Sequence, residues 1–362
     1  MKRSASWWWK IPAGALAAVL AAVLIYIGYA LTAYYRVEDW QELPVNGSGG
    51  GPAETERSYT LLSYNIGFGA YSPDYGFFMD GGDYSRALSE KAVRVNMDGA
   101  LSEAAAWQPD FIFLQEVDAD ATRSYHLDEQ AMAAEALGQD MAWTSAQNYD
   151  SPYLLWPLSC PHGASRSGIM TFSRRTVSGA VRRSLPVEEG LTRYLDLDRC
   201  YTVTRVPVEN GRELCLYNVH LSAYTSDGTV AIRQLEQLTA DMAAEYAAGN
   251  YAVCGGDFNK DLLGDSAAVF GVESQGQTWA QPFPEELLSG GIRLAVPDAG
   301  AAEPAPTCRN ADGPYQPGTS FVLTVDGFLV SENVEVEEAA VADTGFAWSD
   351  HNPVRLTFRL KE

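Results

Sequence analysis

"YAVCGGDFNKDL", residues 251–262, begins as an apolar run that is typical of a buried strand and ends in polar residues. Asp257 and Asn259 follow the run, one residue apart. Asp and Asn are common turn residues because their side chains hydrogen-bond to nearby backbone, so the pair alone indicates no more than a turn. A functional site is indicated only if other strands of the chain end in side chains that can act together with these two.

Strand-like and helix-like segments alternate from residue 58 to the end of the chain. Apolar residues spaced three and four apart predict helices over 90–107 and about 229–247. Many strands with few helices between them predict an α/β fold, a four-layered sandwich in which two packed mixed sheets are flanked by helices. The expected strands cover residues 58–66, 110–117, 167–174, 200–208, 213–221, 251–258, 321–330, 334–341 and 353–360.

Six of these strands carry polar side chains at comparable positions near their ends. Turn-forming residues scattered at random would supply Asp, Asn, Ser and Gly, but they would not so readily supply Glu and two His. The pattern therefore indicates one shared site. Its candidate residues are Asn65; Gln115 and Glu116; Asn218 and His220; Asp257 and Asn259; Asp326; and Ser349, Asp350 and His351.

Seven short motifs around these residues carry a family resemblance. In chain order they read "LLSYNIGFG", "FLQEVD", "SGIMTFS", "NVHLSAY", "GGDFN", "VDGFLVS" and "SDHNPV". The order resembles the endonuclease/exonuclease/phosphatase superfamily, which includes deoxyribonuclease I, neutral sphingomyelinases and inositol polyphosphate 5-phosphatases. The resemblance covers roughly residues 58–361 and is strongest to bacterial membrane-anchored members. It implies metal-dependent hydrolysis of phosphate esters.

The resemblance also implies a metal site. Glu116 matches the principal metal ligand of the family, assisted by Asn65, and Asp350 matches a residue that contributes to the same or a second metal position. Hard carboxylate oxygens suit Mg²⁺, with Mn²⁺ as a substitute, because Mg²⁺ binds through one or two carboxylates and keeps several waters. Whether one or two ions act is left open by the spacing.

The resemblance also implies roles for Asp257, Asn259 and the residues around them. Asp257 fits the residue that orients and deprotonates the attacking water, and Asn259 fits a donor to the phosphate beside it. His220 and His351 resemble the family's histidine pair, which binds the phosphoryl oxygens as charge develops. Asp326 resembles the carboxylate that hydrogen-bonds one of these histidines and favours its protonated form.

Three further residues are candidates for substrate binding. Asn218 lies beside His220 in its motif, and Arg309, in "PTCRN", resembles a family position that precedes the Asp326 strand. His126, in "RSYHLDE", follows Glu116 closely and would border the site, although a lone His is more often an ordinary surface or core residue.

The N-terminus has the composition of a single membrane span. Residues 11–35 carry no charge, and a helix of that length extends roughly 37 Å, more than the ~30 Å hydrocarbon core of a bilayer. Three basic residues precede the run and two acidic residues soon follow it, which predicts a cytoplasmic N-terminus, residues 1–10, and an extracytoplasmic remainder. The alternative is a cleaved signal peptide.

Residues 36–57 are expected to form a flexible linker, because "LPVNGSGGGPAETER" within them is rich in Gly, Pro and polar residues. The catalytic domain is then expected over 58–362. The sequence thus predicts a single-pass protein of the cell membrane whose catalytic domain is extracytoplasmic. Two long aromatic segments, 67–89 and 147–166, are expected to be functional loops.

Composition restricts the partners. The net charge of −22 is spread along the chain, which argues against a tight, sequence-independent grip on a polyanion. A small or lipid-borne phosphoester is therefore favoured over long duplex DNA. The substrate classes considered are nucleic acid, a phospholipid head group and a small phosphodiester, and no obligate protein partner is implied. Five cysteines without a Cys-x-x-Cys pair indicate neither a disulfide framework nor a zinc site.

The sequence-based hypothesis is a membrane-tethered, Mg²⁺-dependent phosphodiester hydrolase, endonuclease-like or sphingomyelinase-like. A phosphomonoesterase acting on inositol or other small phosphates is one alternative. A catalytically silent binding module of the same fold is another, and it would be expected to have lost site residues that this chain keeps. A purely structural surface protein would bind neither Mg²⁺ nor Mn²⁺ tightly.

Overall fold

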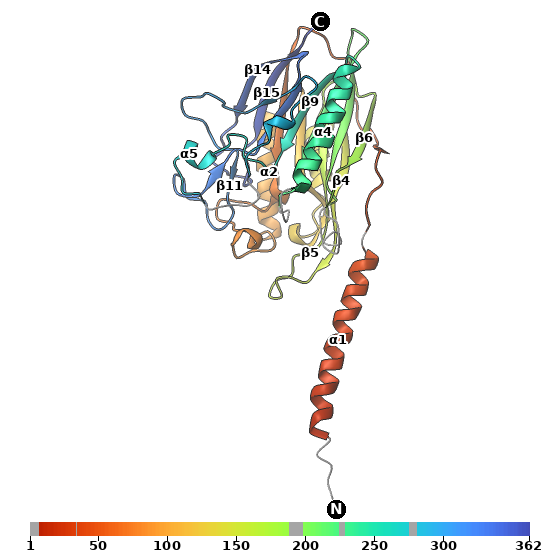
Figure 1. Ribbon diagram of the computed structural model, residues 1–362, viewed down its shortest axis with the longest axis vertical. Coiled ribbons are helices and arrows are strands. Elements are labelled where there is room, and N and C mark those ends of the chain that lie inside the picture. Colours follow the sequence, from red (N-terminus) through yellow and green to blue (C-terminus); the bar gives the residue numbers. More distant parts are fainter. Residues whose placement is uncertain (1–6, 34, 188–197, 224–228, 275–280) are drawn as a thin grey trace, which may run out of the picture.

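Two mixed sheets pack face to face, and helices cover their outer faces (Figure 1). This arrangement confirms the predicted four-layered α/β sandwich. The structure is a computed structural model, and it describes residues 7–33, 35–187, 198–223, 229–274 and 281–362.

The first sheet has seven strands, and the second has six. In spatial order the first contains β1 (Gln41–Glu42), β6 (Gly179–Ser184), β7 (Cys200–Pro207), β8 (Glu213–His220), β9 (Tyr251–Asp257), β13 (Asp326–Ser331) and β10 (Ile292–Ala295). The second contains β14 (Val334–Val341), β15 (Val354–Leu360), β2 (Ser58–Asn65), β3 (Phe111–Ala121), β5 (Gly163–Ser173) and β4 (Ala142–Leu154). The pairs β2–β3 and β8–β9 are parallel.

The helices lie outside the sheets, and a short ribbon lies beside them. The α-helices of the domain are α2 (Glu90–Ala106), α3 (Glu129–Leu137), α4 (Thr229–Ala247) and α5 (Ser266–Phe270). Short 3₁₀ helices are η1 (Gly67–Gly69), η2 (Phe78–Asp80), η3 (Thr122–Ser124), η4 (Gly138–Asp140) and η6 (Glu285–Leu287). The ribbon pairs β11 (Cys308–Arg309) with β12 (Val322–Leu323).

Three apolar layers separate the four structural layers. On β2, Tyr59 and Leu61 face the other sheet, whereas Tyr64 packs under α2, because successive strand residues point to opposite faces. On β9, Val253 faces the space between the sheets and Cys254 packs under α4. Strands that are buried on both faces read as continuous apolar runs, which is why the sequence predicts them well.

The expected loop at 147–166 is largely a β-hairpin. Its first residues belong to β4, its last residues belong to β5, and only residues 155–162 connect the two strands. β4 carries Pro152 and lies at the edge of its sheet, where a missing N–H costs no ladder hydrogen bond. The proline and the polar residues around it conceal the strand from a reading of the sequence. Residues 153–160 are named the hairpin tip below.

An apolar helix, α1 (Trp7–Ala33), extends from one end of the domain (Figure 1). Its segment Trp9–Ala33 has 25 residues and a most apolar window of mean hydropathy 2.2, and nearly all of it is exposed, with Ala30 as the buried exception. It is the one helix among the described residues whose length and composition suffice to cross a membrane, a test that a signal sequence would also pass.

Residues 36–57 differ from the expected flexible linker and are named the N-terminal strap. The backbone N–H of Val37 donates to Asp198 Oδ2 (3.0 Å), and β1 pairs with β6. Further along, Asn46 bridges to Trp143, and Ala53 N–H donates to the carbonyl of Pro207 (2.8 Å). The Gly and Pro residues of this segment belong to an extended chain that is hydrogen-bonded to the domain. The ordered domain therefore begins before residue 58.

Candidate active site

Strand register brings the predicted polar residues to one edge of the sandwich. In the first sheet, His220 on β8 and Asp326 on β13 both lie opposite Asp257 on β9. In the second sheet, Asn65 at the end of β2 lies opposite Gln115 on β3. Parallel strands end at the same edge of a sheet, so side chains far apart in the sequence converge there.

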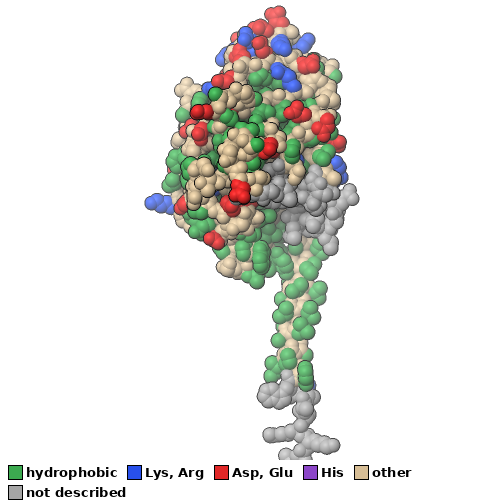
Figure 2. Space-filling view, turned by 60° about the vertical axis from the view of Figure 1, so that its left-hand side comes forward, with side chains coloured by type: hydrophobic (Ala, Val, Ile, Leu, Met, Phe, Trp, Pro, Cys, Tyr) green, Lys and Arg blue, Asp and Glu red, His purple; other side chains and the backbone are tan. Residues whose placement is uncertain are grey.

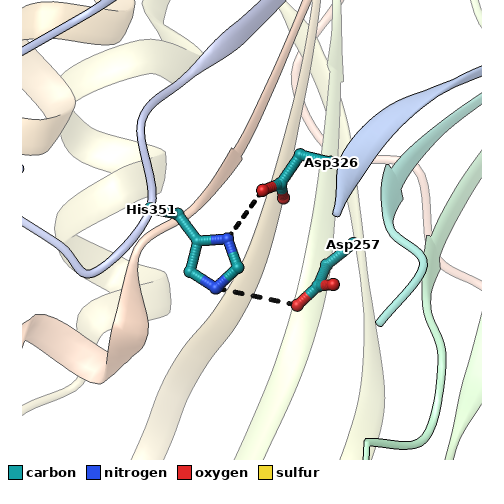
Figure 3. Close-up of side chains that lie close together, drawn as sticks. All are labelled: Asp257, Asp326 and His351. Carbon is teal, nitrogen blue, oxygen red and sulfur yellow. Dashed lines mark hydrogen bonds and ion pairs between the residues drawn. The ribbon is translucent and has the colours of Figure 1, made fainter. Parts of the chain in front are cut away.

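His351 lies between two carboxylates (Figure 3). Its Nδ1 is 2.7 Å from Asp326 Oδ2, and its Nε2 is 3.8 Å from Asp257 Oδ2. Burial acts to lower the pKa of His351, but the Asp326 carboxylate and the Cys308 thiol together raise it well above its ordinary value. The ring is therefore an imidazolium at neutral pH, with a donor on each nitrogen.

His220 has the opposite character. Burial lowers its pKa well below the ordinary value, and the charges of Arg199 and His351 act in the same direction. Its Nε2 lies 3.3 Å from Asp257 Oδ2. Within the described part of the chain its buried Nδ1 has no hydrogen-bond partner. The expected histidine pair thus consists of one charged and one neutral ring, and the neutral ring keeps a polar atom free for a ligand.

Asp257 is poised to exchange a proton. Burial raises its pKa to about 7, while the charge of His351 opposes the shift. A carboxylate whose pKa lies near neutrality is suited to general-base catalysis. The backbone N–H of Asn259 donates to Asp257 Oδ1 (2.8 Å), and its side-chain amide donates to the carbonyl of Leu221 (2.8 Å). Asn259 therefore positions the base, while its side chain lines the cavity.

A β-bulge directs Glu116 into the cavity. The register of β3 shifts between Leu114 and Val117, and Glu116 has a φ of 56°, a left-handed conformation that is costly for a residue with a side chain. Asn65 Nδ2 donates to Glu116 Oε1 (3.2 Å) and to Asp257 Oδ2 (3.1 Å), while its oxygen accepts from Gly67 N–H (3.0 Å). In this arrangement Asn65 orients the two carboxylates rather than presenting an oxygen to a cation, which differs from the expected ligand role.

Glu116 and Asp350 form a site that fits a hard divalent cation. Burial raises the pKa of Asp350 to about 6, and the charge of Glu116 adds to this shift whereas His351 opposes it. Neither carboxylate forms an ion pair with Lys or Arg in the described ranges. Neighbouring carboxylate oxygens that form no ion pair with Lys or Arg are the donor set that Mg²⁺ and related ions prefer.

A second group of ligand atoms, from Asp257, Asp326 and His351, lies within 4.8 Å of one another. It is a poorer cation site, because an imidazolium has no lone pair to offer a metal. Its hydrogen bonds are those of a proton-handling group. The chemistry of the two groups thus suits Glu116 and Asp350 better to a cation, and the buried trio better to proton transfer.

The site opens into a cavity of about 850 Å³. Its base contains most of the candidate residues above, and three arginines also line it, Arg123, Arg199 and Arg309. Arg123 pairs with Asp118 (Nη2 to Oδ1, 2.8 Å) and lies over the Phe68 ring. These arginines give an acidic chain a local positive lining near its catalytic groups. The sequence does not predict that Arg123 and Arg199 line the cavity, because nothing in their sequence neighbourhoods distinguishes them from other arginines.

The three candidate substrate-binding residues lie in different environments. Arg309 is buried, lines the cavity, and donates through Nη2 to the carbonyl of Ser72 (3.0 Å). Asn218 is fully buried between the sheets, where it accepts from Gln115 and does not reach the cavity. His126 is exposed, pairs with Asp120 (2.6 Å), and also lies outside the cavity lining.

The chain is similar to known proteins over most of its length. A family model described as Endonuclease/Exonuclease/phosphatase family matches residues 62–351. No curated protein matches the chain. Among solved structures, an endonuclease/exonuclease/phosphatase from Beutenbergia cavernae DSM 12333 is 21% identical with a TM-score of 0.57, over 84% of this chain and 72% of that one.

Two further solved structures are similar over nearly their whole length. The human Nocturnin catalytic domain, with a bound sulfate anion, is 18% identical with a TM-score of 0.51, over 88% of this chain and 98% of that one. ANGEL2, a 2′,3′-cyclic phosphatase in complex with adenosine-2′,3′-vanadate, is 15% identical with a TM-score of 0.55, over 88% of this chain and 99% of that one. At these identities the likeness shows the fold.

Proposed function

The chain belongs to the endonuclease/exonuclease/phosphatase family of metal-dependent phosphoester hydrolases, and on that premise we propose that it is a membrane-tethered, Mg²⁺-dependent phosphodiesterase that acts outside the cytoplasm. The observation that carries the proposal is the arrangement of Asp326, His351 and Asp257 beside the carboxylates of Glu116 and Asp350. It combines a base, a cationic donor and a cation site in one cavity.

The residues divide the work of hydrolysis. Asp257 accepts one proton of the attacking water, whose oxygen bonds to phosphorus. The ester P–O bond breaks with its electron pair on the leaving oxygen, which takes a proton from solvent. His351, held by Asp326, donates to the phosphoryl oxygens as their charge develops. Neutral His220 has a single N–H, which donates from Nε2 to Asp257 and orients that base. A divalent ion held by Glu116 and Asp350 would supply further neutralisation of that charge.

A diester is favoured over a monoester by the character of the cavity. A monoester dianion needs concentrated positive charge, but Arg123 is already paired with Asp118. Aromatic side chains, including Phe68, Tyr71 and Tyr149, line much of the remaining wall. Space of about 850 Å³ accommodates substituents on both sides of a phosphodiester.

The location rests on α1 and the charges around it. Lys2, Arg3 and Lys10 precede the apolar run, and Glu38 and Asp39 follow it soon after. This bias favours a cytoplasmic N-terminus and an extracytoplasmic domain. A signal sequence is the competing interpretation, and the molecular mass of the mature protein in membrane fractions decides between them.

The activity is tested on the full chain in detergent with Mg²⁺ or Mn²⁺. The substrates are an aryl phosphodiester, the matching monoester, plasmid DNA, single-stranded RNA, inositol phosphates, sphingomyelin and other phospholipids. We expect metal-dependent diester hydrolysis that is lost in Asp257→Ala and in Glu116→Gln. Glu90→Gln, an exposed change in the first turn of α2, is the matched control and should retain activity. Full activity of Asp257→Ala would refute the proposal, and a preference for the monoester would favour the phosphomonoesterase alternative.

A further inference from the structure

The catalytic cavity extends from the buried acidic residues to the apolar helix. Tyr26 of α1 forms part of its wall. Leu155, Trp156 and Leu158 of the hairpin tip line the same cavity, as does Met79 of η2. A cavity whose base is lined by charged residues of both signs is therefore apolar at its mouth.

Hydrogen bonds hold the hairpin tip against α1. Tyr26 Oη donates to the carbonyl of Tyr153 (3.1 Å), and the backbone N–H of Tyr153 donates to Tyr29 Oη (3.0 Å). Figure 1 shows the β4–β5 hairpin pointing to the end of the domain from which α1 extends. The mouth is thus built jointly by the helix and the hairpin.

This contact lies at the level of a bilayer surface if α1 spans a membrane. A hydrocarbon core of ~30 Å corresponds to about 20 helical residues, which, counted from Ile11, end at Ala30. Tyr26 and Tyr29 then lie where interfacial tyrosines are enriched. The hairpin tip, which contacts both, lies at the same depth.

The hairpin tip has the composition of a membrane-contacting surface. Trp156 is 66% exposed and Leu158 is 75% exposed, and residues 153–160 include no Lys, Arg, Asp or Glu. Figure 2 shows hydrophobic side chains gathered on the end of the domain next to the helix. Large apolar side chains exposed together at one end, beside a membrane-spanning helix, are stabilised by contact with lipid.

We infer that the substrate is a phospholipid of the bilayer that holds α1, and that its head group enters the cavity between the hairpin tip and Tyr26. This inference rests on the proposed function. The acyl chains remain in the leaflet beside the apolar mouth, and the anionic phosphodiester reaches Arg309 and His351 at the base. Water oxygen bonds to the lipid phosphorus, one P–O ester bond breaks, and the released alcohol takes a proton from solvent. The charge of −22 and the uncharged mouth disfavour a nucleic acid in the same place.

The test uses the full chain reconstituted with Mg²⁺ in vesicles. Separate vesicles contain phosphatidylglycerol, phosphatidylethanolamine, phosphatidylcholine or sphingomyelin, and a soluble aryl phosphodiester is assayed in parallel. In Trp156→Ser and Leu158→Ser we expect the ratio of lipid hydrolysis to soluble diester hydrolysis to fall about tenfold. Val269→Ser, an equally drastic change at a 47% exposed residue of α5, should leave the ratio unchanged.

A second readout does not depend on activity. Cys160, the last residue of the hairpin tip, is exposed, whereas the other four cysteines are buried. A spin label on Cys160 should be more accessible to lipid-soluble oxygen than to an aqueous nickel chelate, and the reverse order would overturn the inference.

The outcomes separate the two claims. Hydrolysis of the soluble diester without hydrolysis of any lipid overturns the inference and leaves the proposed function standing. An unchanged ratio in both hairpin variants, or faster cleavage of plasmid DNA than of lipid, also overturns the inference. Hydrolysis of none of these substrates overturns both claims.

Discussion

Replacing Asn218 by Ala distinguishes an amide that stabilises the packed sheets from one that binds substrate. The side chain is fully buried, its Nδ2 donates to the carbonyl of Met170 (2.8 Å), and its oxygen accepts from Gln115 Nε2 (2.8 Å). Both partners belong to the second sheet, so Asn218 links the two sheets through polar contacts. We expect the variant to lose stability and to keep its catalytic parameters.

The expected loss is about 3–4 kcal/mol. Each hydrogen bond contributes about 1 kcal/mol net, and the space left by the amide adds about 1–2 kcal/mol, as for other buried truncations. Gln115 Nε2 keeps its bond to Ser63 Oγ (3.1 Å), which limits the cost of removing its other acceptor. Asn218 does not line the cavity, so kcat/KM should stay within about threefold of the original value.

The assay combines urea denaturation with hydrolysis of a soluble phosphodiester, both on the full chain in detergent. Asn210→Ala is the control, because exposed Asn210 makes a hydrogen bond to Tyr251 (2.9 Å) whose loss should cost less than about 1 kcal/mol. A kcat/KM that falls more than tenfold while the free energy of unfolding is unchanged would refute the structural role and restore Asn218 as a substrate contact.

Asp257→Asn should lower kcat by about 10²–10⁴-fold, since a general base is lost, while Asp261→Asn, also buried but outside the cavity lining, should change kcat less than twofold in the same assay; equal losses would point to damage to the fold. Burial lowers the pKa of His162 to about 4 from 6.5, so the unfolded state binds more protons between these values. The stability that neutral His162 contributes is complete above pH 6.5 and falls with pH, by about 2 kcal/mol at pH 5. Between pH 7 and pH 5, the His162→Asn variant should lose less free energy of unfolding than the original protein, as measured by denaturation at both pH values. An identical loss in the two proteins would contradict a buried neutral ring. Ala53→Asp should cost at least about 2 kcal/mol, because Ala53 is fully buried in the N-terminal strap, whereas unchanged thermal stability would mean that residues 36–57 are a free linker after all.

The sequence predicts the strands that are buried on both faces, since their apolar runs are continuous and end in polar residues. It also predicts the meeting of His220, Asp257 and Asp326, because neighbouring strands end at one edge and the register places all three side by side. The charge states follow only from the structure. His351 is cationic and His220 is neutral because one ring has Asp326 beside it and the other faces Arg199 and His351 in a buried setting.

Three features escape prediction for physical reasons. β4 is an edge strand, so Pro152 and polar residues are tolerated in it and mask its period. The N-terminal strap is held by backbone hydrogen bonds, which any composition can make, so its Gly and Pro content indicates a linker instead. Arg123 reaches the cavity through its pairing with Asp118 and its contact with Phe68, and neither contact leaves a mark on the sequence pattern.

The N-terminal strap limits how far the domain can move relative to α1. A flexible chain of the same 22 residues would have a root-mean-square end-to-end distance of about 26 Å, and the domain could move over that range. The strap instead runs along the domain to the end where the C-terminus lies, with Glu56 N–H bonded to the carbonyl of Leu360 (2.9 Å) (Figure 1). If α1 spans a membrane as proposed, the strap restricts the height and tilt of the domain above the bilayer. An enzyme held in this way meets a lipid substrate by diffusion in the plane of the membrane. Its rate should follow the mole fraction of substrate in the surface, so that dilution with inert lipid slows turnover even when the total lipid concentration is constant.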